Sequence, residues 1–286
     1  MVTKTASGPN KRGFLSMRNY LKIGAVSLIA LAAAGGPAVA AENVFGDIGF
    51  NTNTHFVSYG LDVWGAGNSF YGNRMTNSIY GDLGVKITPE LTWLLNAWTD
   101  LNTNAAPSLG GSLQELDINT GFAYTFGGGF TGSVMYGAWS YAGSVEEIVD
   151  VALSYDDTGL IFEGVGFMPK VTWHNRTAGN GAQATGSAVV VSVGPSFPLG
   201  ESGVTLSVPA GMAFFNESNF QGGTSGGLSY GYIGGSLGMP LSFVPSKYGA
   251  WSANFDLIGY FTKPSAIPAN PRADFLTGSF NIKMAF

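Results

Sequence analysis

Apolar and polar residues alternate in steps of two along most of the chain beyond residue 40. The clearest stretch is the last, "GSFNIKMAF", in which Phe280, Ile282, Met284 and Phe286 are apolar and the residues between them are polar or small. Strict alternation predicts a β-strand with one apolar and one polar face. No stretch shows a convincing helical period, so the pattern predicts an all-β protein.

The alternation divides residues 41–286 into about twelve strands, with ten or fourteen as the alternatives. The predicted strands cover residues 52–64, 78–88, 91–101, 114–126, 130–141, 145–156, 160–174, 186–199, 203–216, 228–243, 250–262 and 272–286.

The connections between these strands alternate in length. The short links are "PE", "GGG", "DTG", "GES" and "VPSKYG", and most of the others are long and rich in Gly, Asn, Ser and Pro. In an up-and-down antiparallel sheet, alternate connections lie at the same edge, and outer-membrane barrels have short turns at one edge and long loops at the other. We therefore predict a transmembrane antiparallel up-and-down β-barrel. A soluble β-sandwich or lipocalin-like barrel is the alternative.

Charged residues fall on the polar side of the alternation. A lipid-facing Arg or Lys costs about 2–4 kcal/mol at the bilayer midplane, so a barrel must keep its charges on the lumen side. Lys170 breaks the rule within 160–174 because it shares the parity of Phe162, and a bulge at Pro169 would reset the register. The candidate pore-lining residues are Asp62, Asp82, Lys86, Asp100, Asp117, Asp150, Glu163, Asp256 and Lys283.

The first forty residues have the order of a secretory signal. Basic residues precede the apolar stretch "IGAVSLIALAAAGG", and the small-residue site "AVA" ends at Ala40. We expect residues 1–40 to be cleaved, with Met17 as an alternative start, and residues 41–286 to form the barrel. Cleavage removes five basic residues and leaves 8 Lys and Arg against 18 Asp and Glu. This acidic balance argues against nucleic acid as a partner.

Few residues suggest catalysis. The chain has no cysteine, which excludes disulfides, thiolate metal sites and a cysteine nucleophile. Its two histidines are His55 in the first predicted strand and His174 at the mouth of a long loop. "GTSGG" at 223–227 has the G-x-S-x-G spacing but lies in a Gly/Ser loop without the strand–turn–helix context of that motif. We expect no catalytic residue, no cofactor and no metal ion.

Taken with the export signal and the alternating strands, the C-terminal phenylalanine makes the chain resemble a Gram-negative outer-membrane β-barrel. The resemblance implies a location in the cell outer membrane, contact with its lipid, and the barrel-assembly machinery as a partner. It also implies that Phe280, Ile282, Met284 and Phe286 form the insertion signal. "THFVSYG" at 54–60 is similar to the S-x-Y-x-x-R-G opening of a porin family, with Tyr59 in the position of the arginine.

The predicted lumen is acidic and contains many small residues, which favours a porin-like channel for passive diffusion of small cationic or neutral solutes. One alternative is an outer-membrane barrel enzyme acting on lipid through His174. The other is a closed barrel that acts structurally or as an adhesin. The solute and the oligomeric state do not follow from the sequence.

Overall fold

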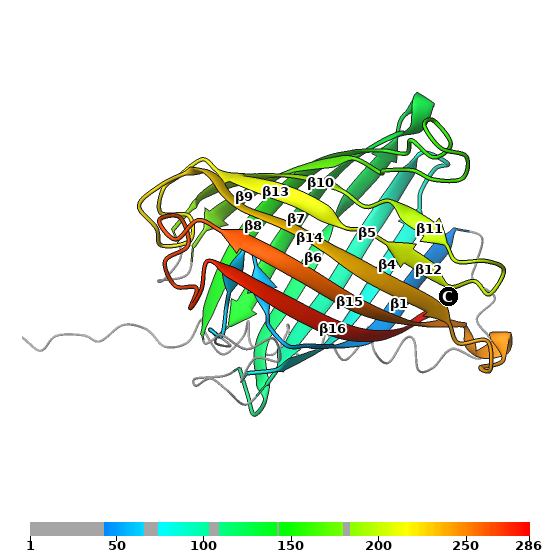
Figure 1. Ribbon diagram of the computed structural model, residues 1–286, viewed down its shortest axis with the longest axis horizontal. Coiled ribbons are helices and arrows are strands. Elements are labelled where there is room, and N and C mark those ends of the chain that lie inside the picture. The colour runs from blue at the N-terminus through cyan, green and yellow to red at the C-terminus, as the bar shows by residue number, and fades with distance from the viewer. Residues whose placement is uncertain (1–42, 66–73, 103–108, 142, 180–183) are drawn as a thin grey trace, which may run out of the picture. The chain divides into compact units, whose positions relative to one another are not determined.

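The computed structural model describes residues 43–65, 74–102, 109–141, 143–179 and 184–286, and the predicted export signal at 1–40 lies outside them. These residues form a closed antiparallel barrel of twelve strands, as the alternation predicted (Figure 1). Two of the twelve are interrupted and carry two labels each, β10 with β11 and β12 with β13.

The barrel strands follow the chain order around the wall. They are β1 (Val44–Asn53), β4 (Thr76–Lys86), β5 (Leu91–Leu101), β6 (Leu113–Thr125), β7 (Phe130–Tyr141), β8 (Ser144–Tyr155), β9 (Lys170–Ala178), β10 (Gly186–Val193), β11 (Ser196–Pro198), β12 (Thr205–Ser207), β13 (Ala210–Phe215), β14 (Gly227–Pro240), β15 (Ala250–Thr262) and β16 (Asp274–Ala285). Two short 3-10 turns, η1 (Gly127–Gly129) and η2 (Ser246–Tyr248), lie in connections. No helix in the described ranges is long and apolar enough to cross a membrane.

The two ends of the described chain close the barrel. β16 pairs with β1 from Asp47–Ala285 to Asn53–Ser279. Beyond the last ladder pair, Gly46 and Phe286 exchange two backbone hydrogen bonds of 3.1 and 3.0 Å. The ring of Phe286 lies where a side chain at position 46 would project, so glycine at this position makes room for the terminal aromatic ring. The C-terminal strand is therefore paired to its last residue.

The two faces of the wall differ as the parity predicted. Large apolar side chains on the outer face are exposed, among them Phe122, Val134, Val151, Leu153 and Leu257. Aromatic residues gather beside short turns on this face, where Phe130 stacks on Tyr155 with ring centroids 4.5 Å apart and Tyr124 packs on Phe126 at 5.1 Å. An apolar band flanked by aromatic residues is the surface that transmembrane barrels present to lipid.

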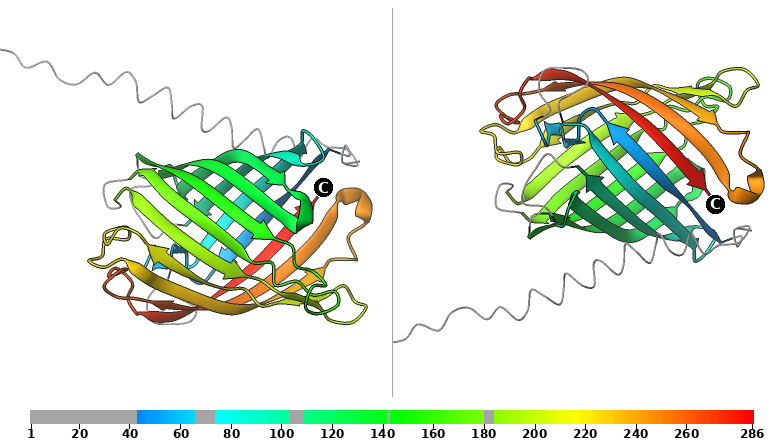
Figure 2. Two further views of the ribbon diagram at one scale, coloured as in Figure 1. Left: turned by 90° about the horizontal axis from the view of Figure 1, so that it is seen from above. Right: turned by 90° about the horizontal axis from the view of Figure 1, so that it is seen from below.

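The predicted first strand at 52–64 is wrong. The first barrel strand is β1, and residues 54–65 leave the wall and fold into the barrel as a small hairpin of β2 (Val57–Ser58) and β3 (Leu61–Asp62) (Figure 2). Residues 51–55, "NTNTH", offer no apolar side to lipid, so the wall strand ends there. Tyr59 and Gly60 both have positive φ, of 46° and 77°, which makes a two-residue turn of type I′.

The predicted strand at 160–174 is also wrong in its bounds. Residues 156–169 form a connection, and β9 begins at Lys170. Phe162 is in this connection, where it makes only an isolated bridge with Val165. Lys170 lies four residues from His174 on one face of β9, so no conflict of parity remains and no bulge at Pro169 is needed. The short link predicted at "DTG" is correspondingly longer.

Candidate functional site

The strand register places seven of the nine candidate pore-lining residues on the face of the wall that the hairpin also occupies. They are Asp82, Lys86, Asp100, Asp117, Asp150, Asp256 and Lys283. Side-chain hydrogen bonds connect several strands along this face: Asn96 donates to Asp82 at 2.8 Å, and Asn119 donates to Asn96 at 2.8 Å. Trp139 extends the row by donating from Nε1 to Asn119 at 3.1 Å. The inner wall is a hydrogen-bonded polar surface.

The remaining two candidates are not on barrel strands. Asp62 lies in the inward hairpin, where its Oδ2 is 3.2 Å from Nδ1 of His55 and both side chains are buried. Glu163 lies in the connection at 156–169, outside the strands. Both were assigned inward by counting along strands that the structure does not contain. Asp62 is inside the barrel for a different reason, because its whole segment folds inward.

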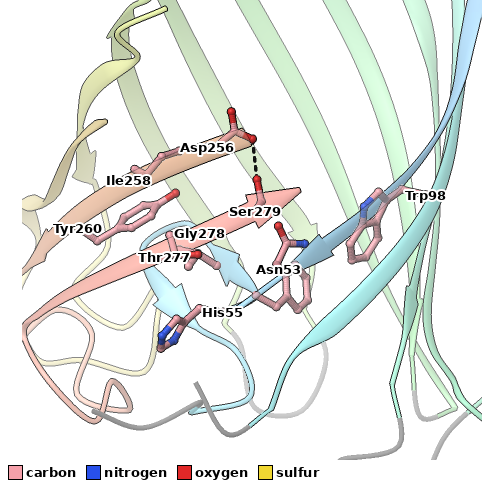
Figure 3. Close-up of a pocket in the computed structure, with 11 residues that line it drawn as sticks. Asn53, His55, Trp98, Asp256, Ile258, Tyr260, Thr277, Gly278 and Ser279 are labelled. Atoms are coloured by element: carbon pink, nitrogen blue, oxygen red, sulfur yellow. Dashed lines mark hydrogen bonds between the residues drawn. The ribbon is translucent and has the colours of Figure 1, made fainter. Parts of the chain in front are cut away.

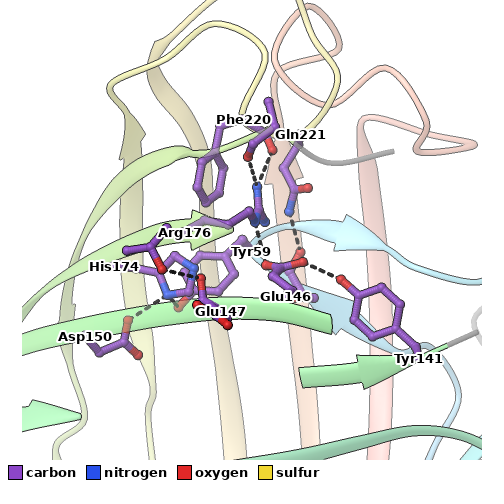
Figure 4. Close-up of polar contacts among 12 residues, drawn as sticks. Tyr59, Tyr141, Glu146, Glu147, Asp150, His174, Arg176, Phe220 and Gln221 are labelled. Atoms are coloured by element: carbon purple, nitrogen blue, oxygen red, sulfur yellow. Dashed lines mark hydrogen bonds and ion pairs between the residues drawn. The ribbon is translucent and has the colours of Figure 1, made fainter. Parts of the chain in front are cut away.

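The hairpin tip is bound to the wall through His174. The hydroxyl of Tyr59 lies 2.5 Å from Nδ1 of His174, and Oδ1 of Asp150 lies 2.7 Å from the same nitrogen (Figure 4). The Tyr59 and His174 rings are also packed with centroids 4.0 Å apart. Desolvation inside the barrel, and then the negative charge of Asp150, raise the pKa of the Tyr59 phenol well above its usual value. Tyr59 therefore stays a neutral hydrogen-bonding group.

A buried ion pair lies next to this contact. Arg176 on β9 contacts Glu146 on β8, with Nε 2.5 Å from Oε1 and both side chains 1% exposed. Tyr141 donates to the other Glu146 oxygen. Nη1 of Arg176 donates to the carbonyl of Phe220 at 2.8 Å, and the guanidinium lies 4.2 Å from the centre of the Phe220 ring. Arg176 thus joins the wall to the inward-packed residues that follow β13.

Further hydrogen bonds hold the hairpin on its other sides. Gln221 donates to the carbonyl of Ser58 at 3.1 Å, and Trp64 donates from Nε1 to Asp100 at 2.7 Å. Asn270 accepts from the Asp62 amide and donates to the Gly60 carbonyl, each at 2.8 Å. Apolar side chains pack in the same half of the barrel, in a cluster of Ala188, Ala213, Phe215, Phe220, Tyr230, Ala266 and Ile267 with Tyr59 and Leu61 against it. The loop-side half of the lumen is therefore filled.

The half of the lumen near the short turns is different. A cavity of about 390 Å³ lies there, lined by residues that include Phe45, Asp47, Asp82, Asn96 and Met135. Asp82 is exposed to this space, and Lys283 pairs loosely with Asp47 at 3.4 Å with side chains 37% and 22% exposed. Glycine residues on the inner wall leave room for aromatic side chains to lie flat, such as Tyr80 over Gly49. This half is open, and its cavity is lined mainly by apolar residues, with Asp47, Asp82 and Asn96 as the polar ones.

Several inward-facing residues were not predicted from the sequence. Asp47 was assigned to no strand because β1 was not found, and Glu146 and Arg176 were not considered. A signal for them was present, since Glu146 shares the parity of Asp150 and Arg176 shares that of His174. The contact of Arg176 with Phe220 had no signal, because it depends on how the segment after β13 folds.

His174, the residue on which the lipid-enzyme alternative depends, lies inside the barrel. Its ring faces the lumen, is 0% exposed, and is enclosed by Tyr59, Trp139 and Phe220. The sequence had placed it at a loop mouth, whereas it lies within β9. In the part of the chain that the structure describes, no group of three or more His, Cys, Asp or Glu residues could hold a metal ion.

The barrel is similar to solved structures at very low sequence identity. One is the NanC porin, with a TM-score of 0.47 at 8% identity, covering 84% of this chain and 98% of that one. A second is LpxR from Salmonella typhimurium, with a TM-score of 0.46 at 10% identity over 83% and 99% of the two chains. A third is the translocator domain of the autotransporter NalP from Neisseria meningitidis, with a TM-score of 0.43 at 9% identity over 96% and 97%. No family model and no curated protein match the sequence.

Proposed function

We propose that the protein is an outer-membrane channel for passive diffusion of small cationic or neutral solutes, narrowed in its loop-side half by the inward hairpin at 54–65. The observation that carries the proposal is the acidic, accessible inner wall beside the short-turn cavity. Side chains fill the interior of an eight-stranded barrel. A twelve-stranded wall leaves more space, and here that space adjoins Asp82 and Asp47 as well as apolar residues such as Leu94 and Met135.

The charge balance of the inner wall supports cation preference. On inward positions of the described strands, accessible acids outnumber accessible bases by four to three. The accessible acids are Asp47, Asp82, Asp150 and Asp256, and the accessible bases are Lys86, Lys170 and Lys283, whereas Asp100, Glu115, Asp117, Glu146 and Arg176 are buried. Rings of acidic side chains attract cations and repel anions in channels. A neutral solute small enough to pass the hairpin would not be rejected.

Location in the outer membrane is part of the proposal. It is supported by the apolar outer face with its aromatic residues. The predicted export signal at residues 1–40 agrees with it. Separation of inner and outer membranes followed by immunoblotting of the full chain tests it; recovery in the inner-membrane or soluble fraction would contradict it.

Purified protein in a planar lipid bilayer tests the channel itself. We expect discrete conductance steps and a reversal potential, under a salt gradient, that indicates preference for cations. Asp82→Asn should move the reversal potential toward the value of an unselective pore, because the substitution removes an accessible negative charge. Absence of conductance would contradict the proposal, as would a reversal potential that indicates anion preference in both the unmodified protein and the Asp82→Asn variant.

A second candidate is a closed barrel with a structural or adhesive role. The filled loop-side half of the lumen favours it, since the hairpin is held by hydrogen bonds on several sides. Silent bilayers together with correct insertion would support this candidate over the channel. Partial deletion of loops that abolishes attachment without changing permeability would support the adhesive form.

A further inference from the structure

We propose that a pocket in the middle of the lumen binds a small organic cation carrying an ammonium or quaternary ammonium group. This rests on the proposed channel function and deepens it, because it names the class of solute. The pocket lies between the root of the inward hairpin and the inner faces of β15 and β16, with β5 on the opposite side (Figure 3). Its volume is about 260 Å³, slightly below the roughly 300–1,000 Å³ of typical ligand pockets, so it suits only a small molecule.

Aromatic rings form two walls of the pocket. Phe56 and Trp98 pack together with centroids 5.1 Å apart and an angle of 32° between their planes. Across the pocket, Tyr260 is stacked on Phe275 at 5.3 Å and 12°, which fixes its ring. The faces of such rings carry negative electrostatic potential and attract cations, Trp most strongly. Rings held in place by neighbours offer this surface at little entropic cost.

A carboxylate completes the pocket. Asp256 lines it and accepts a hydrogen bond from Ser279 at 2.6 Å. Across the described ranges, no Lys or Arg forms an ion pair with Asp256. Lys283 shares β16 with Ser279 but is four residues further along, roughly 13 Å at the rise of a strand, and it pairs with Asp47 instead. The negative charge at Asp256 is therefore available to a ligand.

The combination of rings and one uncompensated carboxylate favours a cation over a neutral sugar. A sugar would also stack on Trp98, but it would leave the charge of Asp256 unneutralised in a narrow lumen, where charge interactions are stronger than in bulk water. A cation is attracted by the rings and the carboxylate together. An anion would be repelled by both.

Choline, its uncharged isostere 3,3-dimethylbutan-1-ol and glucose can test this by isothermal titration into the full chain folded in detergent micelles. We expect saturable binding of choline, with the neutral isostere at least tenfold weaker and glucose without measurable heat. Asp256→Asn, which keeps the acceptor for Ser279, should weaken choline at least tenfold, and Trp98→Leu should weaken it severalfold. Glu90→Gln, in the exposed turn between β4 and β5, is the control for loss of one negative charge and should change choline affinity less than twofold.

Equal binding of choline and its neutral isostere would overturn the proposal, as would absence of choline binding, an effect of Glu90→Gln equal to that of Asp256→Asn, or binding of glucose in place of choline. If Asp256→Asn does not fold, the comparison of choline with the isostere on the unmodified chain decides alone. The binding test is independent of conductance. A barrel that conducts but does not bind choline refutes the proposed pocket and leaves the proposed channel intact. A barrel that binds choline but does not conduct refutes the channel and leaves the pocket intact.

Discussion

The two halves of the lumen share one wall but have opposite interiors. On the loop side, Asp100, Glu146, His174 and Arg176 are each no more than 2% exposed and are held by specific partners. On the short-turn side, Asp82 is exposed beside a cavity. The wall strands alternate in the same way in both halves. The difference therefore comes from the hairpin at 54–65 and from the segments after β13 and β15 that pack against it, and not from the barrel.

The same residue type consequently has a different role in each half. A carboxylate in the filled half must be neutralised or hydrogen-bonded, because a lone buried charge is very costly. A carboxylate in the open half can keep water and act on passing ions. Exposure inside the barrel, rather than inward orientation alone, separates residues that hold the structure from residues that set selectivity.

The largest change should come from emptying the filled half. Replacing residues 54–65 with a short Gly-Ser linker should increase single-channel conductance severalfold, because the hairpin occupies space in the loop-side half of the lumen. Planar-bilayer recording measures this. Replacement of residues 158–166 in the opposite connection, by a linker of equal length, is the control and should leave conductance nearly unchanged. Equal conductance of both variants would mean that the hairpin does not limit flow.

Breaking the buried ion pair should have a large effect on stability. Arg176→Met leaves Glu146 buried without its cation, and we expect a loss of about 3–5 kcal/mol in the free energy of unfolding. Urea titration of the protein in lipid vesicles, followed by tryptophan fluorescence, measures it. The double variant Arg176→Met with Glu146→Gln should lose less than Arg176→Met alone, since no lone charge remains. A double variant that is less stable than the single one would contradict this account.

The same substitution in the two halves sharpens the comparison. Asp82→Asn should reduce cation selectivity with little change in stability, whereas Asp100→Asn should reduce stability with little change in selectivity. The reason is that Asp100 is buried and accepts from Trp64 and Asn102, while Asp82 faces open space. Reversal potentials and urea titrations of both variants measure the two effects. Identical profiles for both variants would remove the distinction between the halves.

The smallest effect should come from the hairpin tip. Tyr59→Phe removes the hydroxyl that contacts His174 but keeps the ring packing, so we expect a loss of about 1 kcal/mol. We also expect more frequent brief transitions in single-channel records, because the tip is held less firmly. Tyr80→Phe, which removes an inward hydroxyl from the open half, is the matched control for the records. Unchanged records in Tyr59→Phe would show that this contact does not hold the hairpin.

Much of the wall could be predicted from sequence, because lipid imposes a strict rule on each outward position. The alternation in "GSFNIKMAF" predicted β16 and its inward Lys283, and the same rule placed Asp82, Asp117 and Asp256 correctly in register. The barrel and its antiparallel order follow from this rule and the lengths of the connections.

The contents of the lumen could not be predicted, because no comparable rule governs them. "THFVSYG" has enough alternation to be taken for a strand. Only the polar run "NTNTH", in which it begins, and the pair Tyr59–Gly60 indicated that the wall strand ends and a turn follows. The alternation in "VFGDIGFN" could have identified β1, but two glycines weaken it: Gly46 on the outer face and Gly49 on the inner face. Contacts such as Arg176 with Phe220 depend on loop conformation, which local pattern does not encode.

The paired backbones of Gly46 and Phe286 have a consequence for how the molecule forms. The first and last wall strands are neighbours, so the final step of folding must join parts of the chain separated by nearly all of the described sequence. Contacts of such long range are slow to form. Until that step occurs, two unpaired strand edges coexist, each able to bind another copy. During folding of this protein, closure within one chain therefore competes with association between chains, and closure requires β16 to reach β1.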